Sequence, residues 1–404
     1  MSIPSEHLLV IGDLSSHHVA AMVAILHPDK GEQVAAYKRI DCHTDDLSDR
    51  GRHEAMAEAV RLVCEQAGIE PWSIYLTRPD ADVVSRMAIG WASPGEEMVL
   101  TAQDRTWALR RAREQATGAD REVLQVVPIV WKVRSREGER EVEDPVGERG
   151  NHLQVEALVV SARRGYREQL AAVAKELQLD LDGVIPQPVA LYRGVAGRLP
   201  KRGLSVVIDM GARHTTILVR RRERLVHIET HAFGGQDLTR RLAEALHIDD
   251  ERAEALKREV DVSSHATSPA PEGQQFIWSD LQERSVQLAP AARILSEALT
   301  AFFKERARDL REQGYLAQQG QVHLVGRGAG LAGLALLLKD VLDLPVVVGS
   351  GDRQRQPGDE LDGLLTAGLV CCAGDLRRER LFAESTTLRK RASGLWSWLM
   401  KPMH

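Results

Sequence analysis

Two acidic residues stand about half a chain apart, each at the point where an apolar β-like run meets a polar turn. Asp13 follows the run Leu8 to Ile11, and Asp209 follows the run Leu204 to Ile208. Tight turns after strands present backbone N–H groups to phosphate oxygens, and carboxylates hold Mg²⁺, usually through water. The two acids therefore predict a nucleoside triphosphate site at which Asp13 and Asp209 bind Mg²⁺.

Polar groups that can donate to phosphate follow both acids. They are Ser15 and Ser16 in the first turn and Gly211, Arg213, His214 and Thr215 in the second. A third turn, Gly326-Arg327-Gly328-Ala329-Gly330, follows a strand-like run and opens a helix, so it could flank an adenosine. Singly these signals are weak, because an acid at a strand end is most often a turn residue and a short glycine pattern is common. Their order along the chain makes them a binding-site prediction.

The elements that must position these turns form an α/β pattern that occurs twice. The first half predicts strands over 8–11 and 19–26, a helix over 54–67 and a strand over 73–77. The second half predicts strands over 204–208, 216–219 and 225–230, then helices over 237–246 and 291–311. Because each half opens with an acid-ended hairpin, we expect a duplicated core. The 404 residues also exceed what one hydrophobic core serves, so two lobes are expected.

A compact insert separates the two patterns. It predicts strands over 83–91 and 123–133 and a helix over 102–115, and a strand over 155–161 follows it. The predicted organisation is a first-lobe core of residues 1–79 with 154–200 and 361–376, an insert over 80–153, a second lobe over 201–360 with a smaller subdomain at about 231–315, and a linker with a C-terminal helix over 377–404.

Composition excludes several classes of protein. A formal net charge of -5 gives no basis for binding nucleic acid. The four cysteines form no CxxC pair, so a zinc or disulfide framework is not expected. Residues Met1 to His7 lack the pattern of a signal peptide, and no run approaches the ~20 apolar residues that span a bilayer. We therefore expect a cytosolic protein.

The order of hairpin, insert, the turn Pro186-Gln187-Pro188, second hairpin and glycine-rich turn resembles the actin and Hsp70 ATPase superfamily. The most specific stretch is Glu143-Asp144-Pro145-Val146-Gly147, followed by Gly150 and Leu153. This stretch is similar to the end of the subdomain that the bacterial cell-division family FtsA carries in place of the usual actin subdomain. The match favours FtsA over the PilM and MreB types.

The resemblance implies an α/β, actin-like ATPase fold of two lobes with a duplicated core and an FtsA-type insert subdomain in the first lobe. It implies that the chain binds ATP with Mg²⁺, polymerises through the insert, and tethers FtsZ filaments to the cytoplasmic face of the inner membrane at the division septum, beside other divisome proteins. It also implies that Gln187 positions the attacking water, a role that needs an amide or carboxylate within hydrogen-bond reach. Gln187 could equally be part of a turn that ends a strand.

Both phosphate turns depart from the family pattern. The family reads Asp-x-Gly-Thr and Asp-x-Gly-Gly-Gly-Thr, whereas this chain reads Asp13-Leu14-Ser15-Ser16 and Asp209-Met210-Gly211-Ala212-Arg213-His214. Added side chains restrict backbone angles and the approach of backbone to phosphate, so the sequence predicts a weak ATPase at most. Arg213 and Arg327 could donate to phosphates as charged groups, or they could fill the cleft.

Two alternative functions stay open. One is a non-hydrolysing membrane adaptor of the same fold with a degraded nucleotide site, serving division or acting as a PilM-type pilus assembly scaffold. The other is a small-molecule kinase on the same two-lobed scaffold, although no acid has a clear claim to the catalytic role that such a kinase needs.

The last residues of the chain combine cations with large apolar side chains. The cations are Arg389, Lys390, Arg391 and Lys401, and the apolar residues include Leu395, Trp396, Trp398 and Leu399. In a helix, tryptophan rings bury apolar area in a lipid headgroup layer while the cations contact anionic lipid. The tail therefore predicts an amphipathic membrane-targeting helix, with a helix that docks on its own domain as the alternative.

Overall fold

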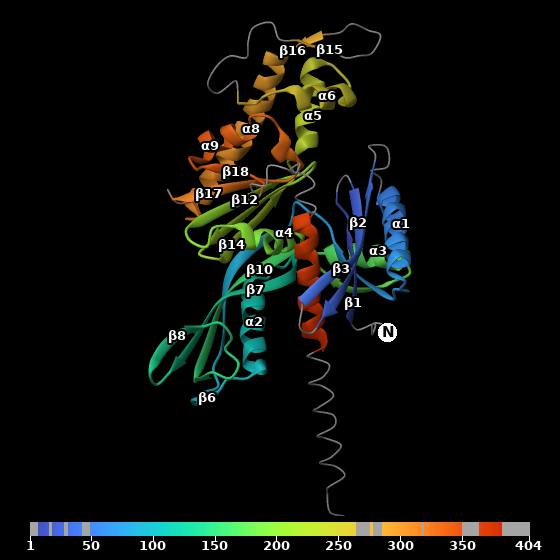
Figure 1. Ribbon diagram of the computed structural model, residues 1–404. Helices are drawn as coiled ribbons and strands as arrows, with labels where there is room; N and C mark the ends of the chain where they lie inside the picture. The colour runs from blue at the N-terminus through green and yellow to red at the C-terminus, as the bar shows by residue number, and fades with distance from the viewer. Residues whose placement is uncertain are drawn as a thin grey trace, which may run out of the picture. The chain divides into compact units, whose positions relative to one another are not determined.

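The computed structural model describes residues 7–15, 18–27, 31–42, 49–263, 275–277, 285–316, 319–349 and 363–381 (Figure 1). Within these ranges the chain divides into two compact units. The first holds the described residues up to Thr77, Gln169–Arg193 and those from Thr366, and the second holds those of Arg78–Glu168 and Gly194–Leu365. Ser16 and the predicted membrane-tail residues from Arg389 to Lys401 lie outside the described residues.

In the described part of the first unit, five strands form a mixed sheet in the order β11-β4-β1-β2-β3. Their bounds are Leu8–Asp13 (β1), His18–His27 (β2), Gly31–Asp41 (β3), Ser73–Thr77 (β4) and Asp180–Val184 (β11). β1 pairs antiparallel with β2 and parallel with β4. Helix α1 (Asp49–Ala67) packs on β2 and β3. The sheet thus places the first acid at the end of a buried central strand.

A glycine precedes that acid for a packing reason. A Cβ on Gly12 would lie 2.8 Å from Leu76 Cδ2 and 3.0 Å from Met56 Sδ, so a side chain there would force the Leu76 side chain of β4 or the Met56 side chain of α1 to move. Both neighbours are fully buried. Because core packing tolerates little added volume, glycine at this position keeps β1 in place between β4 and α1.

Helix α4 (Gln187–Val195) follows β11 and begins at Gln187. The prediction of a strand-ending turn at Pro186-Gln187-Pro188 did not include this helix. Proline is tolerated in the first turn of a helix, because the N–H that it lacks has no intrahelical partner there. The helix start therefore fixes the position of the Gln187 side chain.

In the second unit, the described strands form a nine-stranded sheet in the order β18-β17-β12-β13-β14-β5-β10-β7-β8. The strands at one end are Leu204–Met210 (β12), Thr215–Arg221 (β13), Arg224–His231 (β14), Gly320–Val325 (β17) and Val346–Val348 (β18). Helices α5 (Gly235–Leu246), α6 (Asp250–Glu259), α8 (Leu288–Glu312) and α9 (Leu334–Leu342) bury an apolar core against them. Val206 and Ile208 of β12 lie in this core, and their packing fixes the position of Asp209 near the end of the strand.

The insert contributes β5, β10, β7 and β8 to the other end of the same sheet, and its β6 and β9 pair with each other in a separate two-stranded sheet. Its strands are Val84–Ala92 (β5), Met98–Val99 (β6), Arg121–Ser135 (β7), Gly138–Val142 (β8), Arg149–Gly150 (β9) and His152–Arg163 (β10). Helix α2 (Ala102–Ala116) packs on β5 and β10 around a separate core (Figure 1). A Cβ on Gly90 would lie 1.9 Å from the Ala108 carbonyl oxygen, so glycine is required for the close approach of α2 to β5.

The predicted strands and helices between residues 8 and 311 are confirmed, with ends shifted by a few residues, and the predicted C-terminal helix lies outside the described residues. The sequence did not predict β3, α4, α6 or the short strands β6, β8, β9, β15 (Gln275–Ile277) and β16 (Ser285–Gln287), and β8 lies in a segment that was expected to be a charged turn. β3 is an edge strand with exposed residues on both faces, so it lacks the apolar alternation of a half-buried strand. The predicted domain boundaries, which assign the insert to the first lobe, stay a prediction. Among the described residues, no helix is both long and apolar enough to cross a bilayer.

Candidate functional site

The first acid lies in a buried polar cluster of the first unit. Asp13 is 2% exposed, and the Ser15 hydroxyl donates to its Oδ2 at 2.9 Å. The Gln187 amide donates to Asp13 Oδ1 at 3.3 Å and to Ser15 Oγ at 3.2 Å. His18 Nε2 lies 4.0 Å from Asp13 Oδ2. Three predicted site residues thus meet, because Gln187 reaches Asp13 and Ser15 from a segment more than 170 residues away.

The second acid is the penultimate residue of β12, and a four-residue turn connects β12 to β13. Gly211 N–H donates to the His214 carbonyl at 2.8 Å, which closes the turn. Thr215, another predicted phosphate donor, is fully buried, and its hydroxyl donates to the Phe233 carbonyl at 2.7 Å. The Thr215 hydroxyl therefore ties the turn to the segment that precedes α5.

Helix α5 supports the outer side of the second turn. The N–H groups of Gly235 and Gln236 donate to the carbonyls of Gly211 and Ala212 at 3.0 and 2.8 Å. The Gln236 side chain accepts a hydrogen bond from Arg213 Nε at 2.9 Å. The start of α5 therefore fixes the turn carbonyls and orients the Arg213 guanidinium.

His214 is a half-buried imidazole on the same turn. Burial lowers the pKa of His214, and the charges of Arg213 and Arg78 lower it further. The carboxylates of Asp80 and Asp237 act in the opposite direction without reversing the shift. His214 Nδ1 is buried and has no hydrogen-bond partner among the described residues. A neutral imidazole with a spare ring nitrogen can donate to a phosphate oxygen in the appropriate tautomer.

Replacing His214 with glutamine is expected to make the folded protein less sensitive to acid. Because the pKa of His214 is lowered in the folded state, the neutral ring contributes stability at neutral pH that is lost as the pH falls below the ordinary histidine value of about 6.5. Chemical denaturation at several pH values between neutral and mildly acidic measures this. The matched control is His27→Gln at the end of β2; an equal pH dependence in wild type and His214→Gln would contradict the assignment.

The glycine-rich turn after β17 packs directly on the second acid. β17 runs parallel to β12, with Val325 opposite Asp209. Gly326 has φ 90°, and a Cβ there would lie 2.3 Å from Asp209 Oδ1. A Cβ on Gly328 would lie 2.7 Å from Met210 Cγ. The two glycines therefore allow this turn to contact the end of β12. The turn includes the short helix η4 (Arg327–Gly330), whose first residue, Arg327, is exposed.

A partly buried ion pair beside the second turn was not predicted from the sequence. Lys257 Nζ donates to the Gly235 carbonyl at 2.9 Å and to Thr239 Oγ1 at 2.8 Å, and it forms an ion pair with Glu254. Burial lowers the pKa of Lys257. For Glu254 burial acts to raise the pKa, but the hydrogen bond and charge of Lys257 outweigh it and lower the pKa. The available signal was the Glu-x-x-Lys spacing on a helix, which usually marks a solvated face.

The donor types in the two turns fit a phosphate ligand with Mg²⁺. Mg²⁺ commonly takes one or two carboxylates together with phosphate oxygens and water, and Asp13 and Asp209 are carboxylates at strand ends. The guanidinium and imidazole groups of Arg213 and His214 can donate to phosphate oxygens. Among the described residues, no group of three or more His, Cys, Asp and Glu side chains could hold a metal ion by itself. Each acid belongs to a different unit.

Two family models match this chain. The model described as cell division protein FtsA matches residues 206–366, which contain the second acid and the glycine-rich turn. The model described as the SHS2 domain inserted in FtsA matches residues 86–161, which form most of the insert. Together the two models match more than half of the chain.

Individual relatives agree with these models. Cell division protein FtsA of Streptococcus pneumoniae is 24% identical over 293 residues, 72% of this chain and 64% of the relative. FtsA of Rhizobium meliloti is 32% identical over 277 residues, 63% of this chain and 60% of the relative. The chain thus spans less than two thirds of the length of these relatives.

A solved structure supports the fold. A chain of the PilM-PilN type IV pilus biogenesis complex matches with a TM-score of 0.56 and 17% identity, over 91% of this chain and 98% of that chain. The prediction of an α/β, actin-like ATPase fold with an FtsA-type insert is confirmed.

Proposed function

This chain belongs to the FtsA family of cell-division proteins, and we propose that it binds ATP with Mg²⁺ and tethers FtsZ filaments to the cytoplasmic membrane. The observation that carries the proposal is the contact between the second acid and the glycine-rich turn, where Gly326 leaves no room for a side chain beside Asp209. A glycine-rich turn can present backbone N–H groups to phosphate oxygens, and the neighbouring strand-end carboxylate can hold Mg²⁺. ATP would contribute the triphosphate and its hydrolysable bond.

The residues of each turn have separate roles in this proposal. Asp13 and Asp209 hold Mg²⁺ through water, and Arg213, Arg327 and His214 donate to phosphate oxygens. Ser15, Ser16, Gly211, Thr215, Gly326 and Gly328 shape the two phosphate turns and the turn beside the adenosine.

Gln187 would orient a water molecule in the first turn. Its amide already donates to Asp13 and Ser15, so it lies within reach of water that is bound to this carboxylate. An amide orients water but does not accept its proton, whereas a carboxylate can. ATP hydrolysis is therefore expected to be slow. The side chains of Ala212 and Arg213 lead to the same expectation, because they restrict the backbone of the second turn.

The C-terminal tail would anchor the protein to the cytoplasmic face of the inner membrane at the division septum. The sequence from Arg389 to Lys401 carries cations beside tryptophan and leucine, which suits a peripheral amphipathic helix on anionic lipid. The insert would mediate self-association. Its exposed Met98, Val99 and Val146, on and near β6, support that role, because exposed apolar side chains that gather on one subdomain favour protein contacts. Other divisome proteins are further expected partners.

Liposome sedimentation tests the tether. We expect FtsZ filaments to sediment with anionic liposomes when the full chain is present. A truncation ending at Glu384 is expected to lose both its own liposome binding and the recruitment of FtsZ, because it lacks the tryptophans and the basic cluster.

The matched control for the truncation is Trp72→Ala, which removes a tryptophan of the first unit that is 50% exposed. This variant should bind liposomes like wild type. Unchanged binding by the truncated chain would refute the anchor, and an anchored chain that leaves FtsZ in solution would refute the tether.

A second candidate function is a non-hydrolysing membrane adaptor of the same fold. The observation that favours it is the tied second turn, in which the carbonyls of Gly211 and Ala212 are bonded to α5 and Arg213 is held by Gln236. Such a turn could keep its shape without nucleotide. A chain of a PilM-PilN type IV pilus biogenesis complex has the same fold, so this adaptor could serve pilus assembly as a scaffold instead of cell division.

A further inference from the structure

Strand β5 of the insert has one paired edge and one largely open edge. β10 pairs with it along the whole of Val84–Ala92. On the other side, the pairing with β14 that the described residues show is at Val84 and Glu229 alone. Because backbone groups alternate sides along an antiparallel strand, the N–H and C=O groups of Met87, Ile89 and Trp91 point away from β10. The middle of β5 thus offers backbone hydrogen-bonding groups to a further strand.

Two side chains from α2 cover these backbone groups. Gln115 Oε1 accepts a hydrogen bond from Ile89 N–H at 2.8 Å, and Arg111 Nη1 donates to the Trp91 carbonyl at 3.2 Å. They stand one helical turn apart on α2. Proteins commonly blunt an exposed sheet edge, because unpaired backbone groups there invite another chain. Side-chain caps can rotate away when a strand supplies the same hydrogen bonds.

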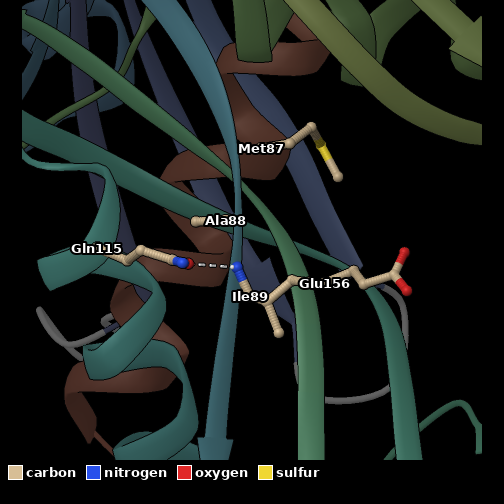
Figure 2. A pocket seen from close by; sticks show the side chains of 5 residues that line it. All are labelled: Met87, Ala88, Ile89, Gln115 and Glu156. Carbon is tan, nitrogen blue, oxygen red and sulfur yellow. Dashed lines mark hydrogen bonds between the residues drawn. The ribbon is translucent and has the colours of Figure 1, made fainter.

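The face of β5 opposite α2 presents a row of exposed apolar side chains. Met87, Ile89 and Trp91 are 38%, 46% and 42% exposed. Met87 and Ile89 line a hollow of about 270 Å³ that Ala88, Gln115 and Glu156 complete. Figure 2 shows these side chains, with the Gln115 amide directed at the Ile89 backbone. An open edge beside an apolar row matches the way extended peptides add to a sheet, by main-chain hydrogen bonds and alternate side-chain contacts.

The charge at this edge selects the occupant. Arg111 contacts the Trp91 carbonyl and lies over the Trp91 ring at 5.1 Å, but no carboxylate of the described residues forms an ion pair with it. Glu156, by contrast, is already paired with Lys132 at 2.7 Å. A second copy paired through β5 would add another uncompensated Arg111 to the joined edge. An acidic residue on an incoming strand would instead neutralise it.

We propose that the open edge of β5 binds an extended segment of another protein, which adds as a strand and carries alternating apolar and acidic residues. Its apolar side chains cover Met87, Ile89 and Trp91, its backbone replaces Gln115 and Arg111 as the partner of β5, and a carboxylate pairs with the released Arg111. This edge is distinct from the Met98, Val99 and Val146 surface and does not depend on bound nucleotide.

Amide NMR of the full chain with synthetic peptides tests the proposal. The probes are capped octapeptides of alternating valine and glutamate, and of alternating valine and lysine. We expect the valine–glutamate peptide to shift the Ile89 and Trp91 amide resonances, and the valine–lysine peptide to bind at least about tenfold more weakly because it opposes Arg111.

Three variants define the site. Ile89→Lys should weaken binding about tenfold by placing a charge in the apolar row, whereas Leu336→Lys, the same kind of change at a 57% exposed leucine on α9, should leave it unchanged. Gln115→Ala should tighten binding about threefold, because the peptide no longer displaces the cap.

Several results would overturn the proposal. Equal binding of the two peptides would remove the charge argument. Unchanged affinity in Gln115→Ala would show that the peptide does not use the Ile89 N–H. A wild-type dimer that Ile89→Lys dissociates would make a second copy the occupant. Loss of ATP binding or of liposome binding affects none of these readouts, so the outcome is independent of the proposed tether.

Discussion

Replacing Gly326 with alanine is expected to lower the unfolding free energy of the second unit by about 3 kcal/mol and to weaken ATP binding by more than about tenfold. The added Cβ would lie 2.3 Å from Asp209 Oδ1 and 2.7 Å from the Met210 carbonyl oxygen. The residue would also have to keep φ near 90°, which L side chains adopt at a cost. The clash acts on a carboxylate that is proposed to hold Mg²⁺, so stability and binding should fall together.

Gly330→Ala is the matched control for that change. Gly330 lies in the same turn, but a Cβ there meets nothing within 4 Å and its φ is not positive. Denaturant unfolding followed by circular dichroism and a nucleotide titration should therefore give wild-type values. If Gly326→Ala is as stable as Gly330→Ala, the result would contradict the close packing of the glycine-rich turn on Asp209.

The second large effect is expected in the insert, where Gly90→Ala should destabilise the packing of α2 on β5 by about 3 kcal/mol or more. The added Cβ would lie 1.9 Å from the Ala108 carbonyl oxygen and 2.7 Å from Ala112 N. These are backbone atoms, so no side-chain rotation relieves the clash and the helix itself must move. Hydrogen exchange of the α2 amides should accelerate, and self-association through the insert should weaken.

Gly118→Ala is the control within the insert. Its Cβ would meet the flexible Asp120 carboxylate at 3.3 Å, a contact that a small rotation relieves. Sedimentation velocity and hydrogen exchange should both match wild type. Unchanged α2 protection in Gly90→Ala would contradict the observed approach of α2 to β5, whereas lost protection with intact self-association would place the self-association surface elsewhere.

The sequence predicted the architecture because its signals are local. The apolar runs before Asp13 and Asp209 predicted both hairpins, and the helix 102–115 and its flanking strands were recognisable from apolar spacing. The insert stretch after Glu143 led to the FtsA family, which the two family models support.

The contacts at the site were not predictable in the same way. The hydrogen bonds from Gln187 to Asp13 and Ser15 join segments more than 170 residues apart, so no local pattern encodes them. Lys257 and Glu254 have the spacing of a solvated helical pair, and the partial burial of Lys257 depends on how α6 packs on α5. Likewise, the need for glycine at position 326 arises from the parallel pairing of β17 with β12, which sets the turn against Asp209.

Isothermal titration of the full chain with ATP, with and without Mg²⁺, tests the central claim most directly. The proposed site predicts saturable binding that Mg²⁺ tightens, and a much smaller Mg²⁺ effect in Asp13→Asn and in Asp209→Asn, because each removes one of the two proposed carboxylates. Absence of ATP binding in the presence of Mg²⁺ would contradict the nucleotide site and would leave the non-hydrolysing adaptor as the function of this fold.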